Sequence, residues 1–502
     1  FKQKTAYEIS LGLVGSEMCI RDRYLAAYIS TMASGGVSPY TSFERLAKAP
    51  EYLFREIRRE AARFFVDVRA LGKDPLTAIE ESAKRVPNRA YRELMLGYTA
   101  TLRAGGDVVH FLQRQTEMMF KGRVGEVRAT GERLGLLMEA YVAVAVVLAL
   151  SVYTIFIVNR ALAQAALPTV GGQQFFLFGY VLLPLVSGVF IYLADMLQPS
   201  YPTSDWRPYY VYFGVSLPLT VLLTVLLAVP FMLPFVPPPL APFAAVTARV
   251  TRALGMPEGF ESGVGMCLAM LVGLAPAIAV SEYYMREHRG VEHGLTRFLR
   301  DLVEVRKTGL SPEKCIVTLA KRDYGRFSKH LRLIARKIGW GRPMREAYED
   351  FAKRVRSWLA RIAMFLLVES IEVGGGTPET LESLASFAEM VELVEREKAR
   401  ALRPLVVVPY IGSVITTLVV VVLVVFMNSI MSIAKIGIPV VSLTRTFLPP
   451  VVINSYLMGL TAGKISAERV CGGFLHAALL VLATLAAMAA SPYLSGFVKL
   501  GV

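Results

Sequence analysis

The sequence predicts an all-α integral membrane protein with about seven transmembrane helices and two copies of a cytosolic helical bundle. Three observations predict this class: high apolar content, a bias of Lys and Arg toward two polar blocks, and a motif that recurs in both blocks. The chain has 502 residues, of which 54% are hydrophobic. Its mean hydropathy of +0.47 is too high for an ordinary soluble protein.

Seven uncharged runs are candidates for the membrane spans. A bilayer core of roughly 30 Å needs about 20 residues of helix, and every run except 446–463, which is marginal, meets that length. The run 208–248 has several prolines after position 233, so we predict one span to about 233 and then a proline-rich external loop. The runs occupy 140–158, 175–194, 208–248, 262–281, 404–434, 446–463 and 470–498.

The two polar blocks, 24–134 and 285–403, both carry more Lys and Arg than Asp and Glu. This bias places them on the cytosolic side, and the four spans predicted within 135–284 return the chain to that side. Residues 404–502 then hold spans five to seven. A net charge of +15 could also indicate nucleic-acid binding. We disfavour that reading because the basic residues alternate with Glu every three or four positions, as on solvated helix faces.

A short motif occurs in both blocks, with an offset of 273 residues. Gly36-Val37-Ser38-Pro39 matches Gly309-Leu310-Ser311-Pro312, and Leu-Ala-Lys follows each copy. Farther on, glycines precede a helix start in each copy, after which a long helix leads into a span, with a kink expected at Pro404. Ser before Pro is typical of a helix N-cap. We predict structural turns at Gly36, Pro39, Gly105, Gly106, Asp107, Gly309, Pro312, Gly375 and Gly376.

The first 23 residues resemble the peptide produced when a sequencing adapter is translated by mistake, so we exclude 1–23 from functional reasoning. The alternative is a genuine N-terminal helix. The four cysteines are far apart and contain no CxxC pair, so they suggest neither a disulfide framework nor a zinc site.

The sequence contains no convincing catalytic, cofactor or metal motif. Residues 459–466 look like a phosphate loop, but only three residues separate the glycines and Ile465 follows Lys464, so we predict a cytosolic turn between two spans. His288 and His293 are about 140° apart on a helix and do not converge on a metal. The glycines at 374–376 could hold an anion at the next helix start, although a plain turn is favoured.

A transporter or channel is the alternative function, and a membrane enzyme is a third. Transport would require charged groups near the bilayer centre. Glu139, Asp195 and Glu282 fall instead near the cytosolic ends of spans, which leaves Asn454 and His476 as weak polar exceptions.

The residues 34–39, 71–75 and 105–107, repeated in weaker form downstream, resemble the type II secretion system F-domain family. The arrangement is similar to its archaeal branch, the assembly platforms of archaeal type IV pili and archaella, and covers residues 24 to about 490. The resemblance implies a multi-pass plasma-membrane scaffold without enzymatic activity or cofactor. Its implied partners are a hexameric secretion ATPase, pilin-like subunits, and further copies of itself in a homodimer or larger assembly.

The arrangement of the two polar blocks and their long helices suggests where the parts of such a machine meet. ATP-driven movement would pass through the helices 107–158 and 377–427 into the membrane. The loops 236–261 and 428–446 could meet emerging subunits. The second copy has Thr377 in place of Asp107, so the copies need not contact the ATPase equivalently. Candidate contacts for an acidic partner, with solvated faces near anionic lipid as the alternative, are Arg55, Arg58, Arg59, Arg63, Lys353, Arg354 and Arg356.

Overall fold

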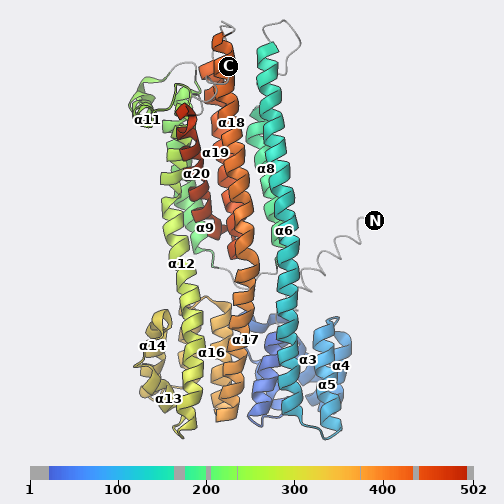
Figure 1. Cartoon of the computed structure of the whole chain (residues 1–502). Helices are drawn as coiled ribbons and strands as arrows, with labels where there is room; N and C mark the ends of the chain where they lie inside the picture. Colours follow the sequence, from blue (N-terminus) through green and yellow to red (C-terminus); the bar gives the residue numbers. More distant parts are fainter. Residues whose placement is uncertain are drawn as a thin grey trace. The chain divides into compact units, whose positions relative to one another are not determined.

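The computed structural model describes residues 22–162, 176–198, 205–233, 236–373, 375–433 and 440–493, and within these ranges every regular element is a helix (Figure 1). The all-α prediction is therefore confirmed. The chain forms two units. The first comprises Phe1–Arg128, Pro199–Asp205 and Met285–Lys398, and the second comprises Ala129–Gln198, Trp206–Tyr284 and Ala399–Val502. Residues 1–21, most of the segment that resembles an adapter, lie outside the described ranges.

The first unit contains both copies of the repeat. The first copy consists of a helix at 22–34 followed by α2 (Pro39–Ala47), α3 (Glu51–Arg69), α4 (Pro75–Arg85), α5 (Arg89–Arg103) and the start of α6 (Val108–Leu162). The second consists of the end of α12 (Glu261–Lys307) followed by α13 (Pro312–Leu319), α14 (Ser328–Gly339), α15 (Met344–Arg354), α16 (Trp358–Glu372) and α17 (Pro378–Leu402). Helix lengths agree between copies: α4 and α15 each have 11 residues, and α5 and α16 each have 15.

Short polar side chains start equivalent helices in the two copies. The Ser38 hydroxyl accepts from the Thr41 amide, and the Ser311 hydroxyl accepts from the Lys314 amide. Gly36 and Gly309, just upstream, have φ of 72° and 88°, a region that a side chain makes costly. Local chemistry therefore explains why the turn recurs at both sites.

The second unit contains six helical segments that are long and apolar enough to cross a membrane, judged by length and composition over the described residues. They are Val108–Phe156, Phe178–Leu197, Arg207–Phe231, Glu261–Lys307, Pro378–Met427 and Val470–Tyr493, three of which begin or end in the first unit. Besides parts of α6, α12 and α17, these segments contain α8 (Leu183–Leu197), α9 (Arg207–Val211), α10 (Leu217–Leu227), most of α18 (Val407–Ile433) and α20 (Gly473–Ala489). Two further α-helices of this unit lie outside the six segments, α11 (Ala241–Ala253) and α19 (Val440–Ala467).

The predicted count of seven spans differs from these six at the run 446–463. This run lies inside α19, which contains Pro449, Pro450 and several polar residues and is not among the six. Most of α19 is nevertheless buried, and it packs beside α18 and α20 (Figure 1). The predicted proline-rich loop at 236–261 is also partly helical, because it includes α11.

The prediction of a turn at 459–466 is wrong, because these residues form the last turns of α19. The two glycines, four positions apart, allow α20 to approach closely. A Cβ on Gly459 would lie 2.3 Å from the Ala477 Cα, and one on Gly463 would lie 1.9 Å from the Gly473 Cα. The spacing that ruled out a phosphate loop is the spacing of small residues at membrane helix contacts.

Lys464, expected at an exposed turn, is buried, and its ammonium lies 2.5 Å from the Asp195 carboxylate on α8. It also donates to the Glu468 carbonyl. The sequence suggested a membrane-surface lysine because the carboxylate that pairs with it, Asp195, lies 269 positions away in the chain.

The long helices that leave the two copies differ in continuity. Helix α6 runs for 55 residues without an internal break. Helix α17 ends at Leu402, and a 3₁₀ turn, η7 (Arg403–Val406), containing Pro404 precedes α18. Proline has no amide hydrogen to continue the helical ladder, which accounts for the expected break at this position.

Candidate functional site

The two copies meet within the first unit around the helix at 22–34. Tyr24, which is buried, makes edge-on ring contacts at centroid distances of 4.7 Å to Trp358 and 5.6 Å to Phe387 in the second copy. It makes a third at 6.1 Å to Phe120 on α6. One aromatic side chain therefore connects the two long helices through a shared apolar cluster.

The stems, as we call α6 and the α17–α18 segment, touch at matching positions. Arg128 on α6 pairs with Glu397 on α17 at 3.0 Å in the first unit. In the second unit, a Cβ on Gly131 would lie 3.1 Å from the Cβ of Ala401. Gly131 and Ala401 are 270 positions apart, the same offset as Asp107 and Thr377. The stems therefore cross at equivalent residues of the repeat.

A second contact between the copies is polar and only partly buried, because Tyr52 is 39% exposed whereas Tyr348 is buried. The Tyr52 and Tyr348 hydroxyls are 3.0 Å apart, and the Arg361 guanidinium lies 5.1 Å from the Tyr52 ring centroid. Nearby, Glu369 on α16 is 1% exposed and lies 3.8 Å from Arg345. Burial raises the pKa of the Glu369 carboxyl, and Arg345 only partly offsets that effect.

A cavity of about 830 Å³ lies beside the first turns of the stems, within the first unit. It holds opposing charges, Arg114 and Glu117 from α6 and Glu379 and Glu382 from α17. No group of three or more His, Cys, Asp or Glu side chains that could hold a metal ion occurs among the described residues. Its other lining residues are Ala27, Ser30, His110, Gln113, Thr116, Ser383, Ser386, Phe387 and Met390.

The predicted turn residues lie at the starts of the stems and of the second helices. Gly105, Gly375 and Gly376 have φ of 67°, 65° and 57°. The Asp107 carboxylate accepts from the His110 amide at 3.0 Å, and the Thr377 hydroxyl accepts from the Thr380 amide at 3.3 Å. Gly106 is not among the positive-φ glycines. Pro39 and Pro312 occupy the first positions of α2 and α13.

The candidate contacts for an acidic partner form two separate sets, one in each copy. Arg55, Arg59 and Arg63 are exposed on α3, where Arg55 lies 3.5 Å from Glu51 and Arg63 lies 2.5 Å from Glu60. Arg58 is half-buried and donates to the Ala47 carbonyl, which makes it the least available of its set. Lys353, Arg354 and Arg356 are exposed at the end of α15 and just beyond it.

The two candidate histidines have different partners. His288 Nε2 lies 3.9 Å from the Asp205 carboxylate, and His293 Nδ1 lies 3.1 Å from the Glu392 carboxylate. The structure therefore does not bring their rings together at one site.

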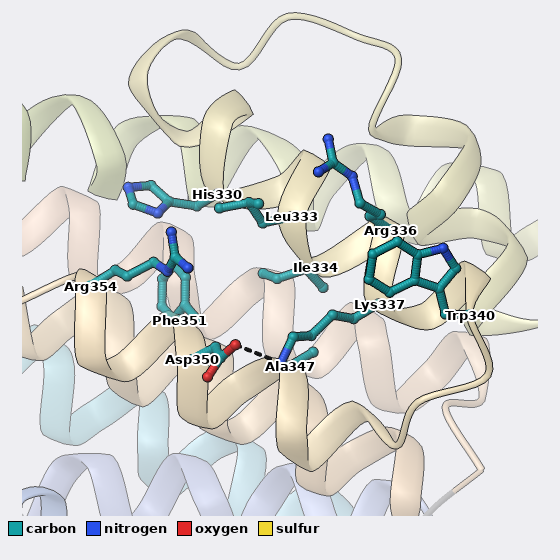
Figure 2. Close-up of a pocket in the computed structure, with 10 residues that line it drawn as sticks. All are labelled: His330, Leu333, Ile334, Arg336, Lys337, Trp340, Ala347, Asp350, Phe351 and Arg354. Atoms are coloured by element: carbon teal, nitrogen blue, oxygen red, sulfur yellow. Dashed lines mark ion pairs between the residues drawn. The ribbon is translucent and has the colours of Figure 1, made fainter.

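Sequence reasoning missed a pocket in the second copy, lined by α14 and α15 (Figure 2). It has a volume of about 120 Å³ and includes His330, Trp340 and Arg354. The available signal was Trp340, a large aromatic residue immediately before the turn glycine Gly341. A large aromatic side chain at a polar turn does not pack in the core, so its presence there points to a binding surface.

The model of the family described as Type II secretion system (T2SS), protein F matches the chain twice, at residues 25–156 and 298–425. Together these segments cover more than half of the chain. The chain belongs to the T2SS protein F family. Each match begins in the first helix of a copy and continues through its stem. Proteins of this family are non-enzymatic, multi-pass membrane platform components involved in secretion and pilus assembly.

A curated relative is an uncharacterized protein of Methanocaldococcus jannaschii, 21% identical over 376 residues. The alignment covers 71% of this chain and 60% of the relative, so the chain spans less than two thirds of that protein. No solved structure matches the T2SS F-family chain.

Proposed function

We propose that this T2SS F-family protein is the membrane platform of an archaeal type IV pilus-like, archaellum or secretion machine. It couples a hexameric cytosolic ATPase to the insertion of pilin-like subunits into a filament. The observation that carries the proposal is the double family match, in which each copy of the bundle leads into an apolar helix long enough to cross a bilayer. The archaeal relative supports the archaeal setting.

The stems supply the mechanical part of the proposal. At 1.5 Å per residue, the 55 residues of α6 extend roughly 80 Å. An unbroken helix carries an axial displacement from its bundle end to its membrane end. The second stem is instead interrupted by the 3₁₀ turn at Pro404, where it can bend. The two stems would therefore pass different displacements to the membrane.

The partners follow from surface charge and from the family. Exposed arginines on α3 and basic residues near the end of α15 would face an acidic surface on the ATPase, with both bundles in the cytoplasm. Pilin-like subunits would approach the apolar helices within the bilayer. A homodimer or larger assembly would present these surfaces symmetrically to a hexameric motor.

The charged pairs of the second unit do not favour transport. Glu261 and Arg445 lie 3.3 Å apart near the starts of α12 and α19, and Asp195 and Lys464 pair near the ends of α8 and α19. A conduction path would place charges at mid-helix, between these pairs.

Copurification tests the proposal. The full chain, solubilised in detergent, should retain the secretion ATPase encoded in the same genome. Reversing Arg55, Arg59 and Arg63 to Glu together, or Lys353, Arg354 and Arg356 together, should reduce the retained ATPase at least fivefold for the set that forms the contact.

Lys121→Glu provides a control, because Lys121 is exposed on α6 and already pairs with Glu117 at 2.6 Å. This variant should retain the ATPase at the wild-type level. The proposal fails if the unmodified full chain retains no ATPase.

A further inference from the structure

The pocket of the second copy has a buried imidazole in its wall. His330 on α14 is 6% exposed, and neither ring nitrogen has a hydrogen-bond partner. Its ring lies edge-on to Phe351 at 5.8 Å, and burial lowers its pKa to about 4. At neutral pH the ring is therefore uncharged, with one N–H donor unused. A buried donor without a partner is costly, and a ligand atom could satisfy it.

The first copy shows what is missing from this pocket. Residues Ala83-Lys84-Arg85-Val86 at the end of α4 recur as Ala352-Lys353-Arg354-Val355 at the end of α15, so Arg85 corresponds to Arg354. Arg85 pairs with the Asp67 carboxylate of α3 at 2.9 Å. Helix α14 occupies the place of α3 in the second copy and contains neither Asp nor Glu. The matching arginine has therefore lost its intramolecular anion.

The remaining charges of the pocket do not replace that anion. The Asp350 carboxylate lies 2.5 Å from the Lys337 ammonium (Figure 2). The Glu346 carboxylate also lies 3.3 Å from the Lys337 ammonium. Glu287, a carboxylate whose charge acts on His330, is paired with Lys329. Among the residues that the structure describes, Arg336 and Arg354 form no ion pair. The charge of Arg354 acts on the Asp350 carboxylate, but at a distance longer than an ion pair. The described part of the pocket thus has two guanidinium groups without an ion pair beside an unused imidazole N–H.

The rim of the pocket is suited to a protein segment. Trp340 is 72% exposed next to Gly341, and it contributes an apolar surface that nothing in the first unit covers. Exposed Trp and Arg side chains around a small cavity are the residue types that dominate binding at protein interfaces. A volume of about 120 Å³ suits one side chain rather than a nucleotide or lipid tail.

We propose that this pocket seats an acidic segment of a partner protein, with a carboxylate bound by Arg354 and His330 and a neighbouring apolar side chain on Trp340. The incoming carboxylate takes the place that Asp67 fills in the first copy. The duplicated bundles are therefore not interchangeable. In the first copy Asp67 neutralises Arg85, whereas in the second copy a carboxylate of the partner protein neutralises Arg354. The inference rests on the proposed function only for the identity of that partner.

Peptide binding to the detergent-solubilised full chain tests the pocket directly. The probe is a fluorescent peptide of alternating Glu and Leu, compared with the same peptide carrying Gln in place of Glu. Fluorescence anisotropy should show binding of the Glu peptide only. Arg354→Gln should weaken it at least tenfold, because the bidentate carboxylate contact is lost. The matched variant Arg85→Gln should bind within twofold of the wild type.

Trp340→Ala is a second test variant in case Arg354→Gln unfolds the protein. Because the Trp340 side chain is exposed, its removal should change the free energy of unfolding very little. It should weaken binding about fivefold without lowering the unfolding temperature. Equal affinity for the Glu and Gln peptides, or unchanged affinity in both variants, would overturn the proposal. Binding to phosphatidylglycerol vesicles that depends on Arg354, with no peptide binding, would assign the surface to the membrane instead. Loss of ATPase copurification with intact peptide binding would count against the proposed function alone.

Discussion

Individual side chains set the starts of the repeated helices, and the chemistry is the same in both copies even where the residue differs. Asp107 starts the first stem, and Thr377 starts the second. An oxygen at this position satisfies an amide that the helix itself leaves without a partner. These starts could be predicted from the sequence because a cap and its helix are neighbours in the chain.

Removal of the first cap should loosen the start of α6. Asp107→Ala leaves the His110 amide without its acceptor and should cost about 1 kcal/mol locally. Hydrogen exchange of the amides of residues 108–111 should accelerate roughly fivefold, while exchange near Tyr141 stays unchanged. Asp107→Ser should restore protection. Equal exchange in the Ala and Ser variants would show that the side-chain oxygen does not stabilise this turn.

Glu369 presents the opposite case, since its partner is distant in sequence and burial dominates its behaviour. The raised pKa means that folding favours the neutral form of the Glu369 carboxyl, so this group costs no stability at low pH. As the pH rises above 4.5, the ordinary pKa of a glutamate carboxyl, Glu369 increasingly destabilises the fold. Glu369→Gln should stabilise the protein by on the order of 1 kcal/mol at pH 8.

The Glu369 prediction is checked by thermal unfolding at two pH values. The difference in unfolding temperature between Gln variant and wild type should be larger at pH 8 than at pH 5. Glu372→Gln is the control, because Glu372 is only partly buried and lies 3.8 Å from Arg45. An identical shift at both pH values would mean that ionisation of Glu369 is not the cause.

At the scale of elements, the contact of α19 with α20 depends on two glycines that the sequence first suggested were part of a turn. In Gly463→Val the new side chain would overlap the backbone of Gly473, which cannot move aside as a flexible side chain can. The expected cost is about 3 kcal/mol, at the upper end for overpacking. Gly188→Val on α8 is the matched control, because nothing lies within 4 Å of a Cβ at that position.

The measurement for this pair is the unfolding temperature in detergent together with the yield of monodisperse protein. Gly463→Val should lose both, and Gly188→Val should keep both. If the two variants behave alike, the glycines of α19 do not form the contact described here.

Helix class and turn positions were predictable from local patterns, whereas the roles of α19 and Lys464 were not. Apolar runs and helix caps involve residues that are close together in the chain, so they can be recognised from the sequence. The fit of Gly463 against Gly473, and the pairing of Lys464 with Asp195, depend on helices 10 and 269 positions away. The pocket at His330 was missed for a related reason. Helix α14 has no carboxylate to pair with Arg354, but this absence is informative only when α14 is compared with α3, the equivalent helix of the first copy.

At the scale of the whole molecule, the duplication places two bundles in one unit and connects each to its own stem. The two stems contact each other at equivalent residues of the repeat. The proposal that they transmit movement from an ATPase requires both bundles to lie on the cytosolic side.

Cysteine labelling in intact cells checks that requirement. Arg59→Cys on α3 and Lys353→Cys on α15 replace exposed residues of the two bundles, and Phe243→Cys lies at an exposed position on α11. A membrane-impermeant maleimide should label Phe243→Cys in intact cells and the other two only after lysis. All three variants carry Cys19→Ser as well, and the chain with Cys19→Ser alone gives the background, which should be low because Cys267, Cys315 and Cys471 are buried. Labelling of one bundle but not the other in intact cells would place the copies on opposite faces. A single motor could not then act on both stems.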